Sequence, residues 1–174
     1  MPGTWDPFET GVRAIIGQQI TLAAANTIVG RLVERFGTPV GGLRQLGLTH
    51  TFPPPETLAV AELGDLGLTR ARATSLRSFA DAVAAGTMRL DRSIPLDRFV
   101  ASVTAIDGLG PWTAHYLALR LGERDACPTA DLGLREALAQ HGRPAELAER
   151  WRPWRALAVT HLWLAGRGPA AEAA

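Results

Sequence analysis

Apolar residues recur at intervals of three and four positions along most of this chain of 174 residues. Phe8, Val12 and Ile15, for example, would lie on one face of a helix, because about 3.6 residues complete one turn. No segment alternates apolar and polar residues as a half-buried strand does. The pattern therefore predicts an all-α protein that folds as one domain. The helices that it indicates lie near residues 7–16, 28–36, 58–62, 76–83, 93–106, 111–121, 131–140, 146–149 and 153–166.

The composition is that of a globular chain with enough material for a core. Hydrophobic residues make up 47%, and 18 basic residues nearly balance 17 acidic residues, which gives a net charge of +1. This excludes an intrinsically disordered protein, because such chains have low hydrophobicity and a high net charge. No apolar run approaches the roughly 20 residues of a membrane span. The first residues also lack the basic and apolar regions of a signal peptide.

The basic residues are unusual in one respect: all 18 are arginine, and the chain has no lysine. A GC-rich coding bias is the simplest explanation, but the chemical consequence is that no lysine amine can form a Schiff base. The single cysteine, Cys127, excludes an intramolecular disulfide, a zinc ribbon and a cysteine-ligated iron–sulfur cluster within this chain. No transition metal is expected, since His115, His141 and His161 lack the spacing of a metal site with Cys127.

A glycine-rich turn separates two of the expected helices at residues 106–113, with the sequence IDGLGPWT. Gly108 and Gly110 allow positive φ and a close approach of the backbone to a partner. The helix that starts at Pro111 would present main-chain N–H groups and a partial positive charge, which suit a phosphate. Thr113 would add a hydroxyl. An ordinary turn between two helices is the alternative interpretation of this motif alone.

The helix after this turn has two different faces. Trp112 and Tyr116 lie one turn apart on the side opposite to its aliphatic residues. Such a helix is either enclosed in a core or lines a cavity. Two further tryptophans, Trp151 and Trp154, are expected to pack in the interior. The aliphatic face consists of Ala114, Leu117, Ala118 and Leu121.

Four segments of the chain carry a joint resemblance to a known family. In order, they are FETGVRAIIGQQI, IDGLGPWTAHYLALR, DACPTADLGL and WRPWRALAVTHLW. With these segments the chain resembles the helix–hairpin–helix (HhH-GPD) DNA glycosylase superfamily, and within it the DNA-3-methyladenine glycosylase II branch. The resemblance covers residues 5–167 and implies a compact helical bundle with an active-site groove. It also implies a core without the N-terminal α/β domain of longer relatives, followed by a disordered tail at residues 168–174.

The resemblance implies roles for individual residues. Asp131 matches the catalytic aspartate of the family. Gln18 and Gln19 match the loop near the DNA minor groove, although the best-known relative has a leucine wedge where this chain has Gln19. A Na⁺ or K⁺ ion would bind hairpin carbonyls near Ile106 and Gly108. The hairpin that grips a DNA phosphate matches Gly108, Leu109, Gly110 and Thr113, and the pocket for the damaged base matches Trp112, Tyr116 and Trp163.

Asp131 suits the chemistry of such an enzyme. A glycosylase extrudes the damaged base from the stack, and cleavage of the N-glycosidic bond leaves positive charge on the sugar. A carboxylate beside the sugar stabilises this charge and can orient water. Asp131 stands near a helix start, where the helix dipole favours an ionised carboxylate. The alternative is that Asp131 is only an N-cap, as most aspartates at such positions are.

The aromatic residues and the missing lysine narrow the expected reaction. Alkylation at a ring nitrogen makes a purine cationic, and an aromatic face attracts a cation by about 0.5–2 kcal/mol. Bifunctional members of the superfamily, which also nick the strand, carry a lysine where this chain has Trp112. We therefore expect a monofunctional enzyme that leaves an intact abasic site. It requires no cofactor and has no iron–sulfur cluster.

Double-stranded DNA with alkylated bases is the partner that the resemblance implies. The protein would be a monomer without a membrane partner, in the bacterial cytoplasm and associated with the nucleoid. A net charge of +1 requires that the DNA contacts be local. Two arginine clusters are candidates, with solvated helix faces and local ion pairs as the alternative. They are Arg70, Arg72 and Arg77, and Arg150, Arg152 and Arg155.

Two other functions fit parts of the pattern. The chain could be a non-catalytic helix–hairpin–helix fragment that binds DNA or recognises damage within a larger alkylation-response protein. Such a binder has no use for Asp131 as a catalyst. A purely structural helical domain would show no salt-dependent binding to DNA.

Overall fold

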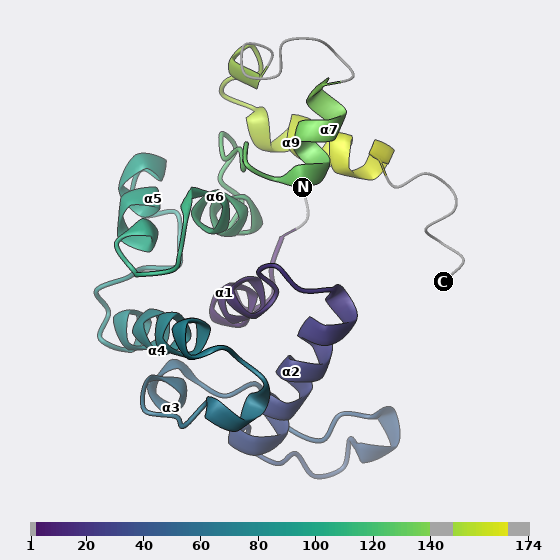
Figure 1. Ribbon diagram of the computed structural model, residues 1–174, viewed down its shortest axis with the longest axis vertical. Helices are drawn as coiled ribbons and strands as arrows, with labels where there is room; N and C mark the ends of the chain where they lie inside the picture. The colour runs from purple at the N-terminus through teal and green to yellow at the C-terminus, as the bar shows by residue number, and fades with distance from the viewer. Residues whose placement is uncertain (1–2, 140–147, 167–174) are drawn as a thin grey trace. The chain divides into compact units, whose positions relative to one another are not determined.

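The computed structural model of the chain describes residues 3–139 and 148–166. Regular structure in this part is helical, and its only β-type pairing is an isolated antiparallel bridge between Pro39 and His50. The prediction of an all-α protein is confirmed (Figure 1). No helix in this part of the chain combines the length and the hydropathy needed to cross a membrane.

Helix starts follow local capping signals. Asp6 caps the first helix, because its side chain accepts the Glu9 N–H at 2.9 Å. Pro7 follows it in the first turn, where no N–H is needed. Thr21 and Thr69 cap two further helices in the same way. The elements are α1 (Pro7–Ile16), α2 (Leu22–Phe36), η1 (Arg44–Leu46), α3 (Pro55–Ala59), η2 (Gly64–Leu66), α4 (Arg70–Ala84), α5 (Leu96–Thr104), α6 (Pro111–Arg120), α7 (Leu132–Ala139) and α9 (Arg155–Gly166).

The chain packs as two compact units. The α4 unit consists of Asp6–Leu90 together with Ala105–Leu109. The α6 unit consists of Asp91–Thr104, the described residues from Gly110 onward and those before Asp6. A single domain over residues 5–167 stays a prediction.

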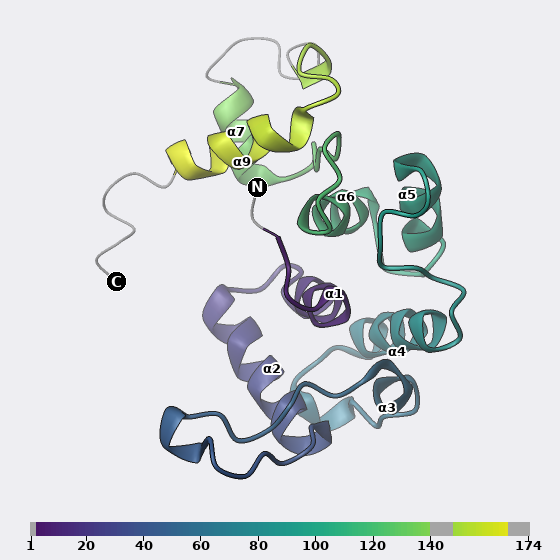
Figure 2. The same cartoon turned by 180° about the vertical axis from the view of Figure 1, so that it is seen from behind.

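In the α4 unit, α4 packs against α1 and α3, and α1 packs against α2 (Figures 1 and 2). Phe8 of α1 and Phe79 of α4 are both buried, and their rings stack with centroids 5.7 Å apart. Gly11 permits this approach, since a Cβ at this position would lie 2.4 Å from the Phe79 ring. The unit therefore has a tightly packed aromatic core along α1 and α4.

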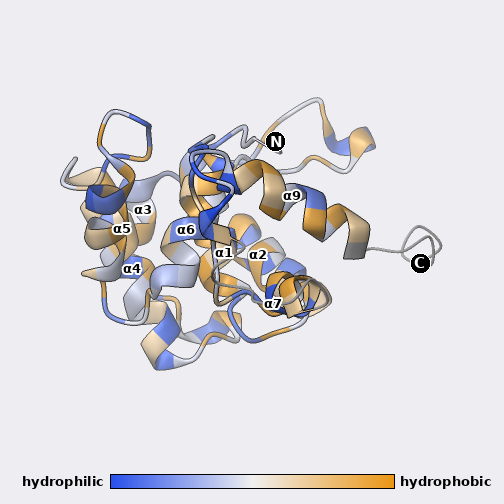
Figure 3. Cartoon of the chain, turned by 90° about the horizontal axis from the view of Figure 1, so that it is seen from above, coloured by the Kyte–Doolittle hydropathy of each residue, from blue (hydrophilic) through white to orange (hydrophobic). Residues whose placement is uncertain are grey.

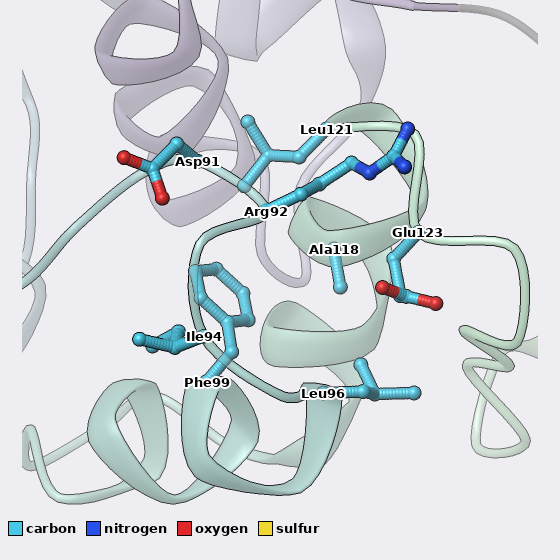
Figure 4. A pocket seen from close by; sticks show the side chains of 8 residues that line it. All are labelled: Asp91, Arg92, Ile94, Leu96, Phe99, Ala118, Leu121 and Glu123. Atoms are coloured by element: carbon cyan, nitrogen blue, oxygen red, sulfur yellow. The ribbon is translucent and has the colours of Figure 1, made fainter.

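In the α6 unit, α5 packs against α6, and α7 packs against α9. The small cavity between α5 and α6 has a volume of about 10 Å³, which leaves room for at most about one water. Phe99 and Leu96 of α5 and Ala118 of α6 line it (Figure 4). α9 is hydrophobic along much of its length (Figure 3), and Leu157 and Leu164 on it are exposed.

Several helices differ from the predicted limits. The helices expected near residues 28–36 and 76–83 begin six residues earlier, at Leu22 and Arg70. The helix expected near residues 58–62 lies earlier, because Pro55 suits a first helical turn and α3 starts there. The helix expected over residues 93–106 ends at Thr104, so Ile106 belongs to the turn before α6. In each case the apolar spacing indicated a helix but not its ends.

The end of the chain also differs from the prediction. α9 starts at Arg155 rather than at Pro153, and the Arg152–Pro153 peptide bond is cis. Trp154, expected in the interior, is 48% exposed, and the Arg124 guanidinium carbon lies 5.2 Å from its ring centroid. A surface cation–π contact takes the place of core packing. The predicted tail at residues 168–174 lies outside the described residues.

Candidate active site and hairpin

Asp131 stands immediately before α7, in the α6 unit. Its Oδ1 atom accepts the Leu134 main-chain N–H at 2.9 Å, and its carbonyl accepts the Arg135 N–H at 2.9 Å. Asp131 therefore caps the start of α7, which is the role that the alternative interpretation gave it. A cap alone, however, needs no further partners.

Two indole N–H groups also donate to the Asp131 carboxylate. Trp112 Nε1, on α6, donates to Oδ2 at 3.1 Å, and Trp163 Nε1, on α9, donates to Oδ1 at 2.9 Å. An ionised carboxylate only accepts hydrogen bonds, so three N–H donors match it. The side chain is half-buried, and donors from three parts of the α6 unit fix its orientation.

The three aromatic residues predicted to form a base pocket lie together. The Trp112 and Tyr116 rings stack with centroids 5.3 Å apart and planes 12° apart. The Tyr116 and Trp163 rings are 6.3 Å apart and tilted by 52°. All three side chains are half-buried. The structure thus brings Asp131, Trp112, Tyr116 and Trp163 into one cluster within the α6 unit.

Arg120 is a member of this cluster that sequence reasoning missed. It donates to the Tyr116 hydroxyl at 3.1 Å, and its guanidinium carbon lies 5.9 Å from the Tyr116 ring centroid. It also donates to the Gly3 carbonyl at 3.2 Å. The available signal was its position four residues after Tyr116 on α6, because side chains at this spacing meet on a helix.

An ion-pair network supports the loop that leads to Asp131. Arg155 at the start of α9 donates to both carboxylate oxygens of Asp125, at 2.8 and 2.9 Å, and to Glu149 at 2.8 Å. Arg152 also pairs with Asp125 and Glu149. Two members of the second arginine cluster are therefore held in local ion pairs, which is the alternative to a DNA contact. We name this network, Asp125 with Glu149, Arg152 and Arg155, the arginine brace.

His115 connects α6 to the same loop. Its Nδ1 atom accepts the Cys127 main-chain N–H at 3.3 Å, so the imidazole must be neutral at this nitrogen. Burial lowers the pKa of His115 below its ordinary value, and the charge of Arg155 lowers it further. Both the geometry and the surroundings therefore favour the neutral imidazole in the fold.

We expect the free energy of unfolding to decrease as the pH falls below about 6.5. His115 has a lower pKa in the folded protein than in the unfolded chain. Its contribution to the free energy of unfolding is therefore complete above the pKa of the unfolded chain. As the pH falls below that value, protons bind the unfolded chain first and the contribution is lost. His115→Asn keeps an acceptor oxygen but does not titrate. Urea titrations at pH 7.5 and pH 5 compare the two proteins. An equal decrease in wild type and variant would contradict the role of His115.

The hairpin turn, residues 105–110, joins α5 to α6. Gly108 is exposed and has φ of +83°, a conformation that favours glycine. Leu109 is 4% exposed and donates its N–H to the Ile106 carbonyl at 3.0 Å. Gly110 is the N-cap of α6 in an extended conformation. The turn therefore combines a buried anchor with an exposed glycine backbone.

Thr113 is placed differently from the prediction that its hydroxyl would contact a phosphate. The residue is 2% exposed and belongs to the interior of the α6 unit. A phosphate contact by its hydroxyl gains no support from this burial. The groups at the start of α6 that suit a phosphate are those of the main chain.

Gln18 and Gln19 lie in the loop of residues 17–21, between α1 and α2 in the α4 unit. Gln19 is exposed and has φ of +58°, which is uncommon for a residue other than glycine. Gln18 is half-buried, and its Nε2 atom lies 3.5 Å from the Gly108 carbonyl, at the outer limit of a hydrogen bond. Backbone strain of this kind is concentrated at functional sites.

The described residues contain no group of three His, Cys, Asp or Glu side chains that could hold a metal ion. His141 lies outside them. The monovalent cation predicted at the hairpin would use main-chain carbonyls instead, and those of Ile106 and Gly108 each accept one contact from the protein. This cation stays a prediction.

Comparisons with known proteins match most of the chain. The family described as HhH-GPD superfamily base excision DNA repair protein matches residues 12–152. A probable bifunctional transcriptional activator/DNA repair enzyme AlkA of Mycobacterium tuberculosis (strain H37Rv) is 41% identical over 170 residues, which cover 94% of this chain and 34% of the relative. DNA-3-methyladenine glycosylase 2 of Escherichia coli (strain K12) is 32% identical over 169 residues, which cover 94% of this chain and 59% of the relative.

The same similarity is found among solved structures. A DNA-3-methyladenine glycosidase from Bacillus halodurans matches with a TM-score of 0.77 and 25% identity, over 99% of this chain and 81% of that chain. The curated relatives are longer, and this chain spans 34% of the mycobacterial one and 59% of the enterobacterial one.

Proposed function

Since the chain belongs to the HhH-GPD superfamily of base excision DNA repair proteins and has their helical fold, we propose that it is a DNA glycosylase that releases alkylated purines. The relatives named DNA-3-methyladenine glycosylase support this substrate class. The observation that carries the proposal is the Asp131 carboxylate, held by two indole N–H groups beside stacked aromatic rings. A protein that only bound DNA would not need such a group.

The proposed role of Asp131 follows from its charge and its fixed orientation. Cleavage of the bond between sugar and base creates positive charge on the sugar, and a carboxylate beside it stabilises this charge. Trp112, Trp163 and Leu134 hold the carboxylate by N–H donors, so it does not reorganise during the reaction. Asp131 would also orient the water that attacks the sugar.

The aromatic cluster would receive the extruded base. A purine alkylated at a ring nitrogen is cationic, and each aromatic face attracts it by about 0.5–2 kcal/mol. The Trp112 and Tyr116 rings stack, so each ring covers one face of the other. The base would stack on a ring face that this contact leaves uncovered. A cationic base is also a good leaving group, which lets one carboxylate suffice without a separate general acid.

The absence of lysine supports a monofunctional reaction. Superfamily members that also cut the strand use a lysine amine, and Trp112 occupies the matching position here. The product would be an intact abasic site. No redox or organic cofactor is needed for this hydrolysis, and the proposed cation at the Ile106 and Gly108 carbonyls would act only in binding DNA.

The hairpin and the loop of Gln18 and Gln19 would hold the duplex. The exposed backbone around Gly108 and the start of α6 would bind a phosphate. Gln19, exposed and with positive φ, would fill the gap that the extruded nucleotide leaves. Binding would bend the DNA and offset the cost of unstacking.

We expect the wild-type protein to release 3-methyladenine from duplex DNA treated with a methylating agent. Chromatography of the released bases and electrophoresis of the strand measure the two products. The strand should break only after alkali or heat, because no lysine is present. Breaks before alkali would contradict a monofunctional enzyme. Salt-dependent DNA binding without base release would instead support the alternative, a non-catalytic DNA-binding fragment.

A further inference from the structure

α4 carries two side chains, three positions apart, that bind the backbones of two other segments. Arg72 donates to the Gln18 carbonyl at 2.5 Å, in the loop between α1 and α2. Ser75 donates its hydroxyl to the Asp107 carbonyl at 2.5 Å, in the hairpin turn. All four residues belong to the α4 unit, so one rigid helix contacts both segments.

The contact with the hairpin is close and buried. Ser75 is 6% exposed, and its single hydroxyl proton faces two carbonyls, of Asp107 at 2.5 Å and of Ala71 at 3.1 Å. The shorter distance makes Asp107 the main acceptor. A Cβ at Gly108 would lie 2.4 Å from Ser75 Oγ, so the hairpin backbone is as near to α4 as a glycine permits.

The contact with the loop restrains a strained segment. Gln19 has φ of +58°, and the carbonyl that Arg72 binds belongs to the residue just before it. A charged donor forms a stronger hydrogen bond than a neutral one, so Arg72 can hold this backbone in place. Gln18 Nε2 reaches the Gly108 carbonyl at 3.5 Å and connects the loop directly with the hairpin.

We propose that Arg72 and Ser75 are positioning residues that hold the loop of residues 17–21 and the hairpin turn at a fixed separation. The proposal rests on the proposed function, in which the hairpin binds a phosphate and the loop fills the gap in the duplex. Because the separation is fixed, binding of the phosphate by the hairpin would at the same time place the loop in the duplex, so phosphate binding and base extrusion would occur together. In this role the Arg72 guanidinium serves the protein backbone rather than a DNA phosphate.

Arg72→Gln should lower base extrusion about tenfold, measured by the fluorescence of 2-aminopurine in a duplex with an abasic-site analogue. The affinity for undamaged duplex and its dependence on salt should not change, because phosphate contacts determine both. Arg72→Lys keeps a charged donor and should restore part of the signal. Arg98→Gln removes the same charge from an exposed helical position on α5, outside both arginine clusters, and serves as the control; its signal should stay at the wild-type level.

Ser75→Ala tests the hairpin half of the proposal. Hydrogen–deuterium exchange in the protein without DNA should become faster at residues 106–109 in Ser75→Ala and at residues 17–20 in Arg72→Gln. This measurement needs neither activity nor DNA, so it separates failure of this proposal from failure of the proposed function. Unchanged exchange in both variants would overturn the proposal. A second result would also overturn it: Arg72→Gln retains the 2-aminopurine signal, but the salt dependence of its DNA-binding constant has a slope reduced by about one. That result would identify Arg72 as a phosphate contact.

Discussion

Asp131→Asn is expected to lower the single-turnover rate of base release from methylated DNA by about 100-fold to 1,000-fold, the usual cost of removing a group that stabilises transition-state charge. Asparagine has nearly the same shape as aspartate but carries no charge. Binding to undamaged duplex should stay within about twofold of wild type, since the proposed role of Asp131 is to act on the sugar and not to bind a DNA phosphate. The release of 3-methyladenine and the binding constant are measured on the same protein preparation.

The hydrogen bonds of Asp131 make a control necessary. Asparagine retains one acceptor oxygen, which can serve Trp163 and Leu134, but its NH₂ group would then face the Trp112 N–H. Two donors would oppose each other, and the aromatic cluster could shift for that reason alone. The double variant Asp131→Asn/Trp112→Phe removes the opposing donor. If this variant regained the wild-type rate, loss of charge would not be the cause and Asp131 would not be the catalyst.

Arg155→Leu is expected to lower the free energy of unfolding by about 3 kcal/mol, because it breaks a buried ion pair and leaves its partner behind. The Arg155 side chain is 8% exposed and that of Asp125 is 18% exposed. Leucine supplies apolar volume but none of the hydrogen bonds to Asp125 and Glu149. Arg152 would stay as the remaining cation beside both carboxylates.

Arg152→Leu is the matched control within the arginine brace. Its side chain is 50% exposed, so solvent screens its ion pairs and the loss should be much smaller. Tryptophan fluorescence during urea unfolding reports this region directly, because all five tryptophans of the chain belong to the α6 unit. Equal losses for the two substitutions would show that burial does not determine the strength of this network.

Local signals made the helices and the hairpin predictable. The Asp6 cap, the stop of α2 before Gly37 and the positive φ of Gly108 depend on residues within one or two turns. The separation of Trp112 and Tyr116 from the aliphatic face of α6 follows from helical geometry alone. Such features need no knowledge of what packs against the helix.

Contacts between distant segments were not predictable in the same way. Nothing in the spacing of Trp112 and Trp163 indicates that both indole N–H groups donate to Asp131, since three chain segments must first pack together. The two hydrogen bonds from Arg155 to the Asp125 carboxylate also join distant segments and were not predictable from spacing. The burial of Thr113 and the exposure of Trp154 were not predictable for the same reason, because each depends on which neighbour covers the side chain.

The closeness of Gly108 to Ser75 has an evolutionary consequence. With 2.4 Å between Ser75 Oγ and the place of a Cβ at residue 108, any side chain added at residue 108 meets an occupied space. A larger side chain at residue 75 would displace the hairpin, and any side chain at residue 108 would displace residue 75. A side chain at residue 108 therefore becomes possible only after residue 75 has lost its hydroxyl, so the order in which the two positions can mutate is constrained.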